Sequence, residues 1–244
     1  AIASSLAEMG SLIVLCLYTK AKIDKEKYGL KPVYDGQLLI KVLNLSVWSM
    51  LHAFISVVPW FLFFVAIEHL GKTELAISNI TRSVSAIFFV IANSFAVTTG
   101  SLVSNAIGAR ARNELFPICH KVLKLGYAVG IPFVVVALLC NRWIVSFYTD
   151  NELLIELAFA PFVVMLLNYT FALPGYVYLN AVGGTGKTKI TFLFQVTTTC
   201  VYLVYLYWLS FCIKASLSLY LTAEYLFVIL LALQSIIHLK SKHY

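Results

Sequence analysis

The sequence predicts an all-α, polytopic membrane protein with about seven transmembrane helices. Of the 244 residues, 61% are hydrophobic and only 12% are charged, and the mean hydropathy is +0.88. Soluble domains carry about 25% charged and about 45–50% apolar residues, so this chain has too few charged side chains to cover a soluble surface. The lengths of its apolar segments and the positions of its basic residues support the same class.

Seven apolar segments are long enough, or nearly so, to cross a bilayer, because a hydrocarbon core of about 30 Å takes roughly 20 helical residues. In chain order they span residues 1–18, 43–68, 76–107, 122–148, 153–180, 189–212 and 217–239. The first is short, begins without Met and lacks the basic stretch of a signal peptide. We therefore expect the chain to start inside a longer protein. The third is long and rich in polar residues, as is typical of a helix that lines a cavity.

The fifth segment carries recognisable signals for a helix start and for kinks. Asp150, Glu152 and Glu156 cluster around its beginning, where carboxylates are stabilised by the positive end of a helix. Pro161 and Pro174 lie inside it, and proline removes a backbone donor and kinks a helix. We expect a bent helix that can serve as a hinge, although packing alone would also tolerate the prolines.

The basic residues predict one orientation in the membrane. If the seven helices alternate in direction, 14 of the 18 Lys and Arg residues fall on one side, in the segments that follow the odd-numbered helices. Cytoplasmic loops are enriched in Lys and Arg, so we expect those helices to run inward and the C-terminus to be cytoplasmic. The net charge of +7 then reflects topology, and we expect no nucleic-acid partner.

The first and last segments echo each other. "AEMGSLIVLCLYTKAK" begins at Ala7 and "AEYLFVILLALQSIIHLKSK" begins at Ala223, which places Glu8 and Glu224 at equivalent positions. The simplest account is a transporter built from two parallel repeats. We therefore predict three parts. These are the last helix of an N lobe (1–19), a cytoplasmic inter-lobe linker (20–41) and a six-helix C lobe (42–244).

Five stretches carry a resemblance to a known family. They are "WFLFFVAIEHLGKTELAISNITRSVSAIFF", "GSLVSNAIGARARNELFPICHKVLKLG", "WIVSFYTDNELL", "YLNAVGGTGKT" and "LTAEYLFVILLALQSIIHLKS". In this order and spacing the chain resembles the C-terminal lobe of a multidrug and toxic compound extrusion (MATE) transporter along essentially its whole length. The resemblance is most specific at "LG…LAISNI" and "LVSN.IG".

The resemblance implies two six-helix lobes around a central cavity and alternating access. It implies a secondary antiporter, not an enzyme, that exports small organic, often cationic compounds in multidrug or xenobiotic efflux. The coupling ion would be H⁺ or Na⁺, with no other cofactor. The protein would cross the bacterial inner membrane many times, with the lipid bilayer and the N-terminal lobe of the same chain as its partners.

Two other functions compete with this one. A lipid-linked saccharide flippase of the same superfamily would need several cationic groups for phosphates, whereas we place only Arg82 within a membrane helix and assign the other Lys and Arg residues to the loops and helix ends. The stretch "NAVGGTGKTK", residues 180–189, nearly fits a phosphate-binding loop. It lies between two apolar segments and does not follow a strand of a soluble sheet, so we interpret it as a tight turn between helices and expect no nucleotide.

Charged residues within membrane helices are costly and usually functional. Glu8 and Glu224 are either a proton- or cation-linked site, a polar contact within each lobe, or acids near the outer interface that pair with a neighbour on the same helix. Arg82 must face the protein interior, water or an acid. Glu68 and Glu74 are plausible partners, and we favour a structural or gating ion pair.

Some MATE members carry acids in the first and fourth helices of the C lobe, and neither helix has one in its middle here. His52 and Ser56 lie about where the first acid would be, so coupling chemistry is expected in the N lobe. A histidine titrates near physiological pH, although a buried, hydrogen-bonded histidine is the alternative.

Further polar and aromatic residues are candidates for a substrate or ion pathway. Aromatic faces attract organic cations, and polar side chains either line a cavity or join helices in lipid. These candidates are Asn93, Asn105, Asn168, Tyr169, Tyr176 and Asn180. The five cysteines form no CxxC pair, so we expect neither a metal site nor a disulfide, and we identify no catalytic residue.

Overall fold

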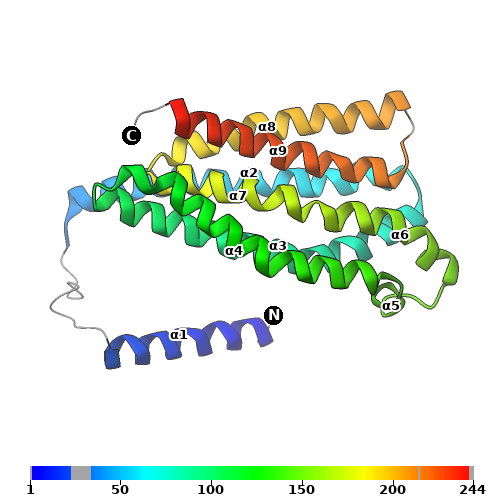
Figure 1. The fold of residues 1–244 in the computed structure, drawn as a ribbon, viewed down its shortest axis with the longest axis horizontal. Coiled ribbons are helices and arrows are strands. Elements are labelled where there is room, and N and C mark those ends of the chain that lie inside the picture. The colour runs from blue at the N-terminus through cyan, green and yellow to red at the C-terminus, as the bar shows by residue number, and fades with distance from the viewer. Residues whose placement is uncertain (1, 23–33, 214, 242–244) are drawn as a thin grey trace. The chain divides into compact units, whose positions relative to one another are not determined.

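The computed structural model describes residues 2–22, 34–213 and 215–241. In these ranges the regular structure is helical, with no strand (Figure 1). The elements are α1 (Ile2–Lys22), α2 (Gly36–Glu68), α3 (Lys72–Gly108), η1 (Arg112–Glu114), α4 (Leu115–Leu139), α5 (Asn141–Ser146), α6 (Glu152–Leu167), α7 (Tyr169–Gly184), α8 (Thr188–Trp208), the π-helical turn η2 (Leu209–Ile213) and α9 (Leu217–Ser241). Residues 23–33, half of the predicted inter-lobe linker, lie outside the described residues.

The chain divides into two compact units, Ala1–Leu43 and Asn44–Tyr244. The first contains α1 and the beginning of α2. Asp35 starts α2, because its Oδ1 accepts hydrogen bonds from the backbone N–H groups of Gln37 (2.9 Å) and Leu38 (3.1 Å). Such a cap satisfies donors that have no partner within the helix.

The second unit is a helix bundle in which α7 is central. This helix packs against α3, α4, α6, α8 and α9, and Ala181 and Val182 in it are completely buried. Small residues permit the close approach. A Cβ on Gly175 would lie 2.7 Å from the backbone oxygen of Val228 in α9. The core of the unit is therefore built around one short helix.

Six helical segments are long and apolar enough to cross a membrane, counted among the described residues. They are Gly36–Glu68, Lys72–Gly108, Arg112–Leu139, Glu152–Gly184, Thr188–Phe211 and Leu217–Ser241. This confirms the predicted all-α membrane class. The predicted first segment corresponds to α1, which is not among the six.

Two predicted segments are interrupted. The fourth, expected to reach residue 148, ends at Leu139, where the Asn141 amide donates to the backbone oxygen of Leu138 (2.6 Å). The short α5 follows. The fifth consists of two helices, α6 and α7, which meet at Asn168.

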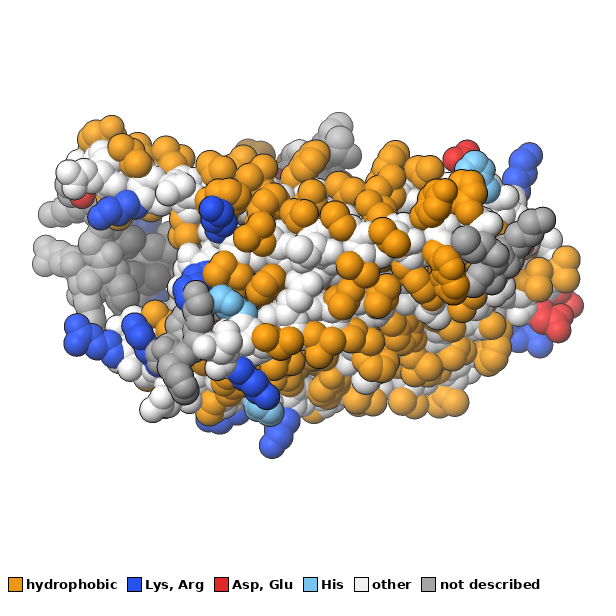
Figure 2. Space-filling view, turned by 90° about the horizontal axis from the view of Figure 1, so that it is seen from above, with side chains coloured by type: hydrophobic (Ala, Val, Ile, Leu, Met, Phe, Trp, Pro, Cys, Tyr) orange, Lys and Arg blue, Asp and Glu red, His pale blue; other side chains and the backbone are white. Residues whose placement is uncertain are grey.

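The distribution of side chains agrees with a membrane position. Figure 2 shows hydrophobic side chains over most of the visible flank, whereas Lys, Arg, Asp and Glu side chains gather toward the ends. Large apolar residues such as Phe54, Phe133 and Val204 are each more than half exposed. In water such a surface would be unfavourable, so lipid is its natural surrounding.

Candidate functional site

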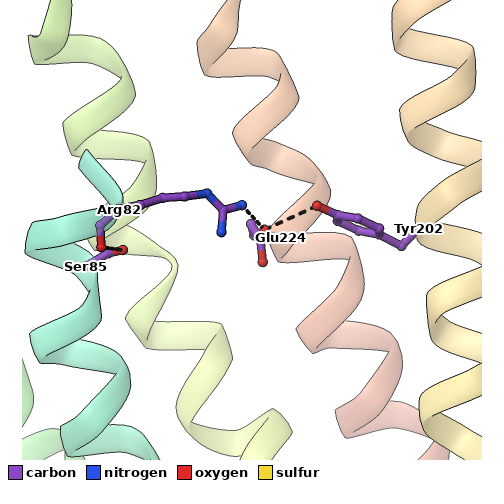
Figure 3. A network of polar contacts seen from close by, with 4 residues as sticks. All are labelled: Arg82, Ser85, Tyr202 and Glu224. Atoms are coloured by element: carbon purple, nitrogen blue, oxygen red, sulfur yellow. Dashed lines mark hydrogen bonds and ion pairs between the residues drawn. The ribbon is translucent and has the colours of Figure 1, made fainter. Parts of the chain in front are cut away.

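A buried ion pair joins two helices that are distant in sequence. Arg82 in α3 and Glu224 in α9 are separated by 142 positions, and Arg82 Nη2 lies 2.6 Å from Glu224 Oε1. The two side chains are only 6% and 17% exposed. The Tyr202 hydroxyl, from α8, donates to the same oxygen at 3.3 Å (Figure 3). Three helices therefore meet at one carboxylate.

Aromatic rings of α2 surround the guanidinium of this pair. Arg82 Cζ lies 4.0 Å from the ring centroid of Phe63, 5.3 Å from that of Phe64 and 5.9 Å from that of Trp60. Cation–π attraction at such distances is stronger where water is excluded. The α2 rings and the Glu224 carboxylate thus hold the guanidinium from two sides.

The predicted partners of Arg82 were wrong. Neither Glu68 nor Glu74 forms an ion pair with it in the described structure, and Glu224 does. Glu74 is eight positions away on the same helix, which is about 12 Å along the axis. The alternative that Glu224 pairs with a neighbour on its own helix is also wrong, because its partners come from α3 and α8.

Next to the ion pair lies a cavity of about 670 Å³. Its walls are mainly apolar and aromatic, with hydroxyl and amide groups among the rings. Six of the predicted site residues line it: Ser56, Arg82, Asn168, Tyr169, Tyr176 and Glu224. Arg82 and Glu224 are the only charged residues on the wall among those that the structure describes.

Two residues of the cavity wall each carry a buried polar atom without a hydrogen-bond partner among the described residues. Arg82 Nε and Asn168 Oδ1 are buried and make no hydrogen bond to any described residue. Asn168 lies at the junction of α6 and α7, and its backbone N–H donates to the backbone oxygen of Val164 (3.2 Å). Burial of an unpaired polar atom is unfavourable, so both residues keep unused hydrogen-bonding capacity beside the cavity.

A second cavity, of about 390 Å³, contains two more of the predicted residues, His52 and Asn180. His52 Nε2 is buried without a hydrogen-bond partner in the described part of the chain, so the alternative of a fully hydrogen-bonded histidine does not hold for this atom. The Asn180 amide donates to the backbone oxygen of Tyr176, 3.0 Å away. Its amide group is therefore engaged within its own helix.

Three predicted residues line neither cavity. Asn93 and Asn105 are exposed on α3. Glu8 is exposed on α1, in the other compact unit. The structure thus brings together eight of the eleven predicted residues, in two separate cavities.

Sequence reasoning identified Tyr169 and Tyr176 but missed the other aromatic residues that shape the first cavity and surround the ion pair. These are Trp60, Phe64, Phe88, Phe89 and Phe227 on its wall, with Phe63 and Tyr202 around the ion pair. Trp60 and Phe64 are four residues apart and so share one face of a helix. This spacing could have suggested an aromatic wall. An isolated aromatic residue in a membrane helix gives no such indication.

The glycine-rich stretch is a turn between two helices. α7 ends at Gly184, and α8 begins at Thr188. Gly186 between them has φ +82°, a conformation that glycine adopts without strain. The Thr188 hydroxyl donates to the backbone oxygen of Leu45 (3.2 Å) and ties the turn to α2. This is the predicted helix–turn–helix arrangement.

The described cysteines Cys16, Cys119, Cys140 and Cys200 are free. The described residues contain no group of three or more His, Cys, Asp or Glu side chains that could hold a metal ion. The described wall of the first cavity offers the Arg82–Glu224 pair, aromatic rings, and amide and hydroxyl groups.

Comparisons with known proteins give a consistent result. The sequence profile of the MatE family matches residues 49–209, whereas no curated protein sequence matches the chain. A crystal structure of MATE in the bent conformation has a TM-score of 0.71 and 17% identity, covering 81% of this chain and 44% of that one.

Two further structures share the fold. An outward-facing multidrug resistance MATE family transporter of the MOP superfamily has a TM-score of 0.68 at 17% identity, with 80% of this chain and 44% of that chain covered. A MOP superfamily transporter from Pyrococcus furiosus, whose reversed pocket polarity suggests a different function, has a TM-score of 0.68 at 17% identity, with 80% and 43% covered. The chain spans less than half the length of these structures.

Proposed function

The chain belongs to the MatE family, and from this premise we propose that it works in a secondary active antiporter. This antiporter exports organic, often cationic compounds in exchange for H⁺ or Na⁺ by alternating access. The observation that supports the proposal is the aromatic cavity of about 670 Å³ with one carboxylate, Glu224, on its wall. Ligand cavities commonly have volumes of about 300–1,000 Å³, and aromatic faces attract cations.

The pairing of Arg82 with Glu224 favours an antiporter over a lipid-linked saccharide flippase. Phosphate recognition needs cationic groups whose hydrogen bonds are free for the phosphate oxygens. Arg82 is the one basic residue on the described cavity wall, and Glu224 already neutralises it. The cavity therefore offers a phosphate no net positive charge.

The proposal also covers the location, the orientation in the membrane and the energy source of transport. We place the protein in the bacterial inner membrane with the turn at Gly186 and the C-terminus on the cytoplasmic side, because Lys and Arg concentrate there. Transport is driven by an ion gradient, and neither nucleotide hydrolysis nor other catalysis is assigned to the chain.

Transport in vesicles tests the proposal. The protein that contains this chain, expressed at full length, is placed in inside-out membrane vesicles with a fluorescent organic cation. We expect uptake when a proton or sodium gradient is imposed and none with ATP alone. Transport that depends on ATP and survives the collapse of every ion gradient would contradict the antiporter. The same vesicles without the protein are the control.

A further inference from the structure

The second cavity, of about 390 Å³, has a wall rich in hydroxyl groups, with no Lys, Arg, Asp or Glu among the described residues that line it. We propose that this cavity is a subsite for a protonated primary amine, carried on an arm of a substrate whose aromatic body lies in the first cavity. This inference rests on the proposed function, and it names aromatic compounds with an aminoalkyl arm as the substrate class.

The two cavities follow one another along the same helices. His52 of α2 and Asn180 of α7 line the second cavity, whereas Ser56 and Tyr176 line the first. On both helices the step between the cavities is four residues, which is about 6 Å along the axis. Residues of α3 line both cavities as well. A short alkyl arm is therefore long enough to reach from the aromatic cavity into the second one.

Several hydroxyl groups on the wall of the second cavity have already used their protons. Three of them donate to backbone oxygens, at 2.8 Å, 3.2 Å and 2.7 Å, and these are Ser104, Thr188 and Thr191. A hydroxyl oxygen whose proton is engaged still has lone pairs that accept. The three groups therefore offer a ligand hydrogen-bond acceptors.

Asn180 adds an amide oxygen to these acceptors. Its NH₂ group donates to the backbone oxygen of Tyr176, 3.0 Å away. This partner fixes the orientation of the amide, because a carbonyl oxygen cannot donate. The Oδ1 atom is thus the end left for a ligand. Neutral oxygens that surround a cation replace its water shell, as they do in the filters of ion channels.

This set of groups selects a cation with N–H donors. An alkyl ammonium group has three donors and no acceptor, so it satisfies several of the oxygens at once. An anion needs donors, and the protons of the three hydroxyl groups are engaged. The end of α7 at Gly184 and the start of α8 at Thr188 both border the cavity, so their opposite dipole charges offset each other. A quaternary ammonium group has the same charge as a primary one but forms no N–H hydrogen bond.

Binding of two matched probes tests the proposal. One is dansylcadaverine, in which a naphthalene ring carries a five-carbon arm with a primary ammonium group, and the other is its trimethylammonium analogue. Both are measured by equilibrium dialysis against the full-length protein that contains this chain, purified in detergent, with protein-free micelles as the reference. We expect the natural protein to bind the primary ammonium probe at least about fivefold more tightly, the equivalent of roughly one net hydrogen bond.

The pH of the assay keeps charge out of the comparison. His52 is the one titratable side chain on the described wall of the second cavity. A pH of about 8 lies above the ordinary pKa of histidine, about 6.5, and below that of an alkyl amine such as lysine, about 10.4. The imidazole is then neutral and both probes carry one positive charge, so the two affinities differ only through the N–H donors.

Variants of the wall separate the subsite from general effects on the fold. Asn180→Leu removes the amide oxygen, so affinity for the primary ammonium probe should fall about fivefold while affinity for the trimethylammonium probe stays the same. Thr191→Val keeps the shape and removes one hydroxyl, and it should shift the ratio in the same direction even if Asn180→Leu does not fold. Asn105→Leu is the matched control, because Asn105 is exposed on α3 and lines neither cavity. Trp60→Ala, in the first cavity, should weaken both probes alike.

Several outcomes overturn the proposal. Equal affinities of the natural protein for the two probes would do so, as would an Asn180→Leu variant that keeps the preference or loses affinity for both probes alike. If Trp60→Ala changes neither affinity, the aromatic body does not lie in the first cavity. Gradient-driven export of both probes without any preference in binding would refute the subsite and leave the antiporter intact. The predicted binding pattern without gradient-driven transport would refute the antiporter and leave the binding site.

Discussion

Gly184 at the end of α7 lies directly against Gly100 in α3. A Cβ on residue 184 would be 2.5 Å from the backbone oxygen of Gly100 and 3.2 Å from its Cα. The Ser104 hydroxyl, also in α3, donates to the backbone oxygen of Gly184 at 2.8 Å. This hydrogen bond stabilises the point where α3 and α7 cross. The glycine-rich stretch therefore includes a contact between two membrane helices as well as a turn.

We predict that Gly184→Ala weakens this crossing. The new methyl group overlaps backbone atoms, so α3 and α7 must separate, and overpacking of this kind costs about 1–3 kcal/mol. Thermal unfolding of the purified protein in detergent should show a lower midpoint. Gly183→Ala is the matched control, because its Cβ would meet only Thr191 Cγ2 at 3.7 Å. Equal midpoints for the two variants would show that the crossing is not tight.

A second prediction concerns Tyr169, which lines the large cavity. Its ring occupies the space beside Gly130, where a Cβ would be 2.1 Å from the ring, and its hydroxyl donates to the backbone oxygen of Gly126 at 2.8 Å. Gly130→Ala should displace the ring and reduce stability more than Tyr169→Phe, which loses one hydrogen bond worth about 1 kcal/mol.

Unfolding midpoints and cation affinity check this second prediction together. Gly130→Ala should lower both, because the displaced ring changes the cavity wall. Gly108→Ala is the control, since its Cβ meets nothing within 4 Å. A Gly130→Ala variant that keeps the midpoint and the affinity of the natural protein would contradict the packing described for α4 and α7.

The turn at Gly186 gives a third prediction. Its φ of +82° is unfavourable for residues with a side chain, yet a Cβ there would meet nothing within 4 Å. Gly186→Ala thus introduces backbone strain without a clash and should cost about 1 kcal/mol. Gly186→Asn should cost less, because asparagine tolerates positive φ better. Equal unfolding midpoints for Gly186→Ala and Gly186→Asn would contradict the idea that glycine is needed here to avoid backbone strain.

The fold was predictable because its signals are local. Apolar length and the distribution of Lys and Arg are visible in the sequence, and six of the expected helices are present. A bend in the fifth segment was expected from Pro161 and Pro174, but its division at Asn168 was not predictable, because apolar residues lie on both sides of that position in α6 and α7. A single buried asparagine in such a run indicates a cavity residue and a helix junction equally well.

The candidate site was predictable only in part. Arg82 and Glu224 stood out one by one, because charges are rare in membrane helices. Their pairing depends on how α3 and α9 pack across 142 positions, which a single sequence does not reveal. The α2 rings around Arg82 were missed for the same reason, since Phe63 is one apolar residue among many in α2.

The last prediction concerns what the ion pair does for stability. Arg82→Leu leaves the Glu224 carboxylate, 17% exposed, with the Tyr202 hydroxyl as its remaining hydrogen-bond donor among the described residues, and a buried charge without its counter-ion costs about 3–5 kcal/mol. Arg82→Leu/Glu224→Leu removes both charges and fills the space with apolar atoms, so it should be more stable than the single variant. Unfolding midpoints of the purified proteins in detergent measure the losses of the two single variants and of the double variant. A double variant whose loss equals the sum of the Arg82→Leu and Glu224→Leu losses would show that the two side chains act independently, against the 2.6 Å contact between them.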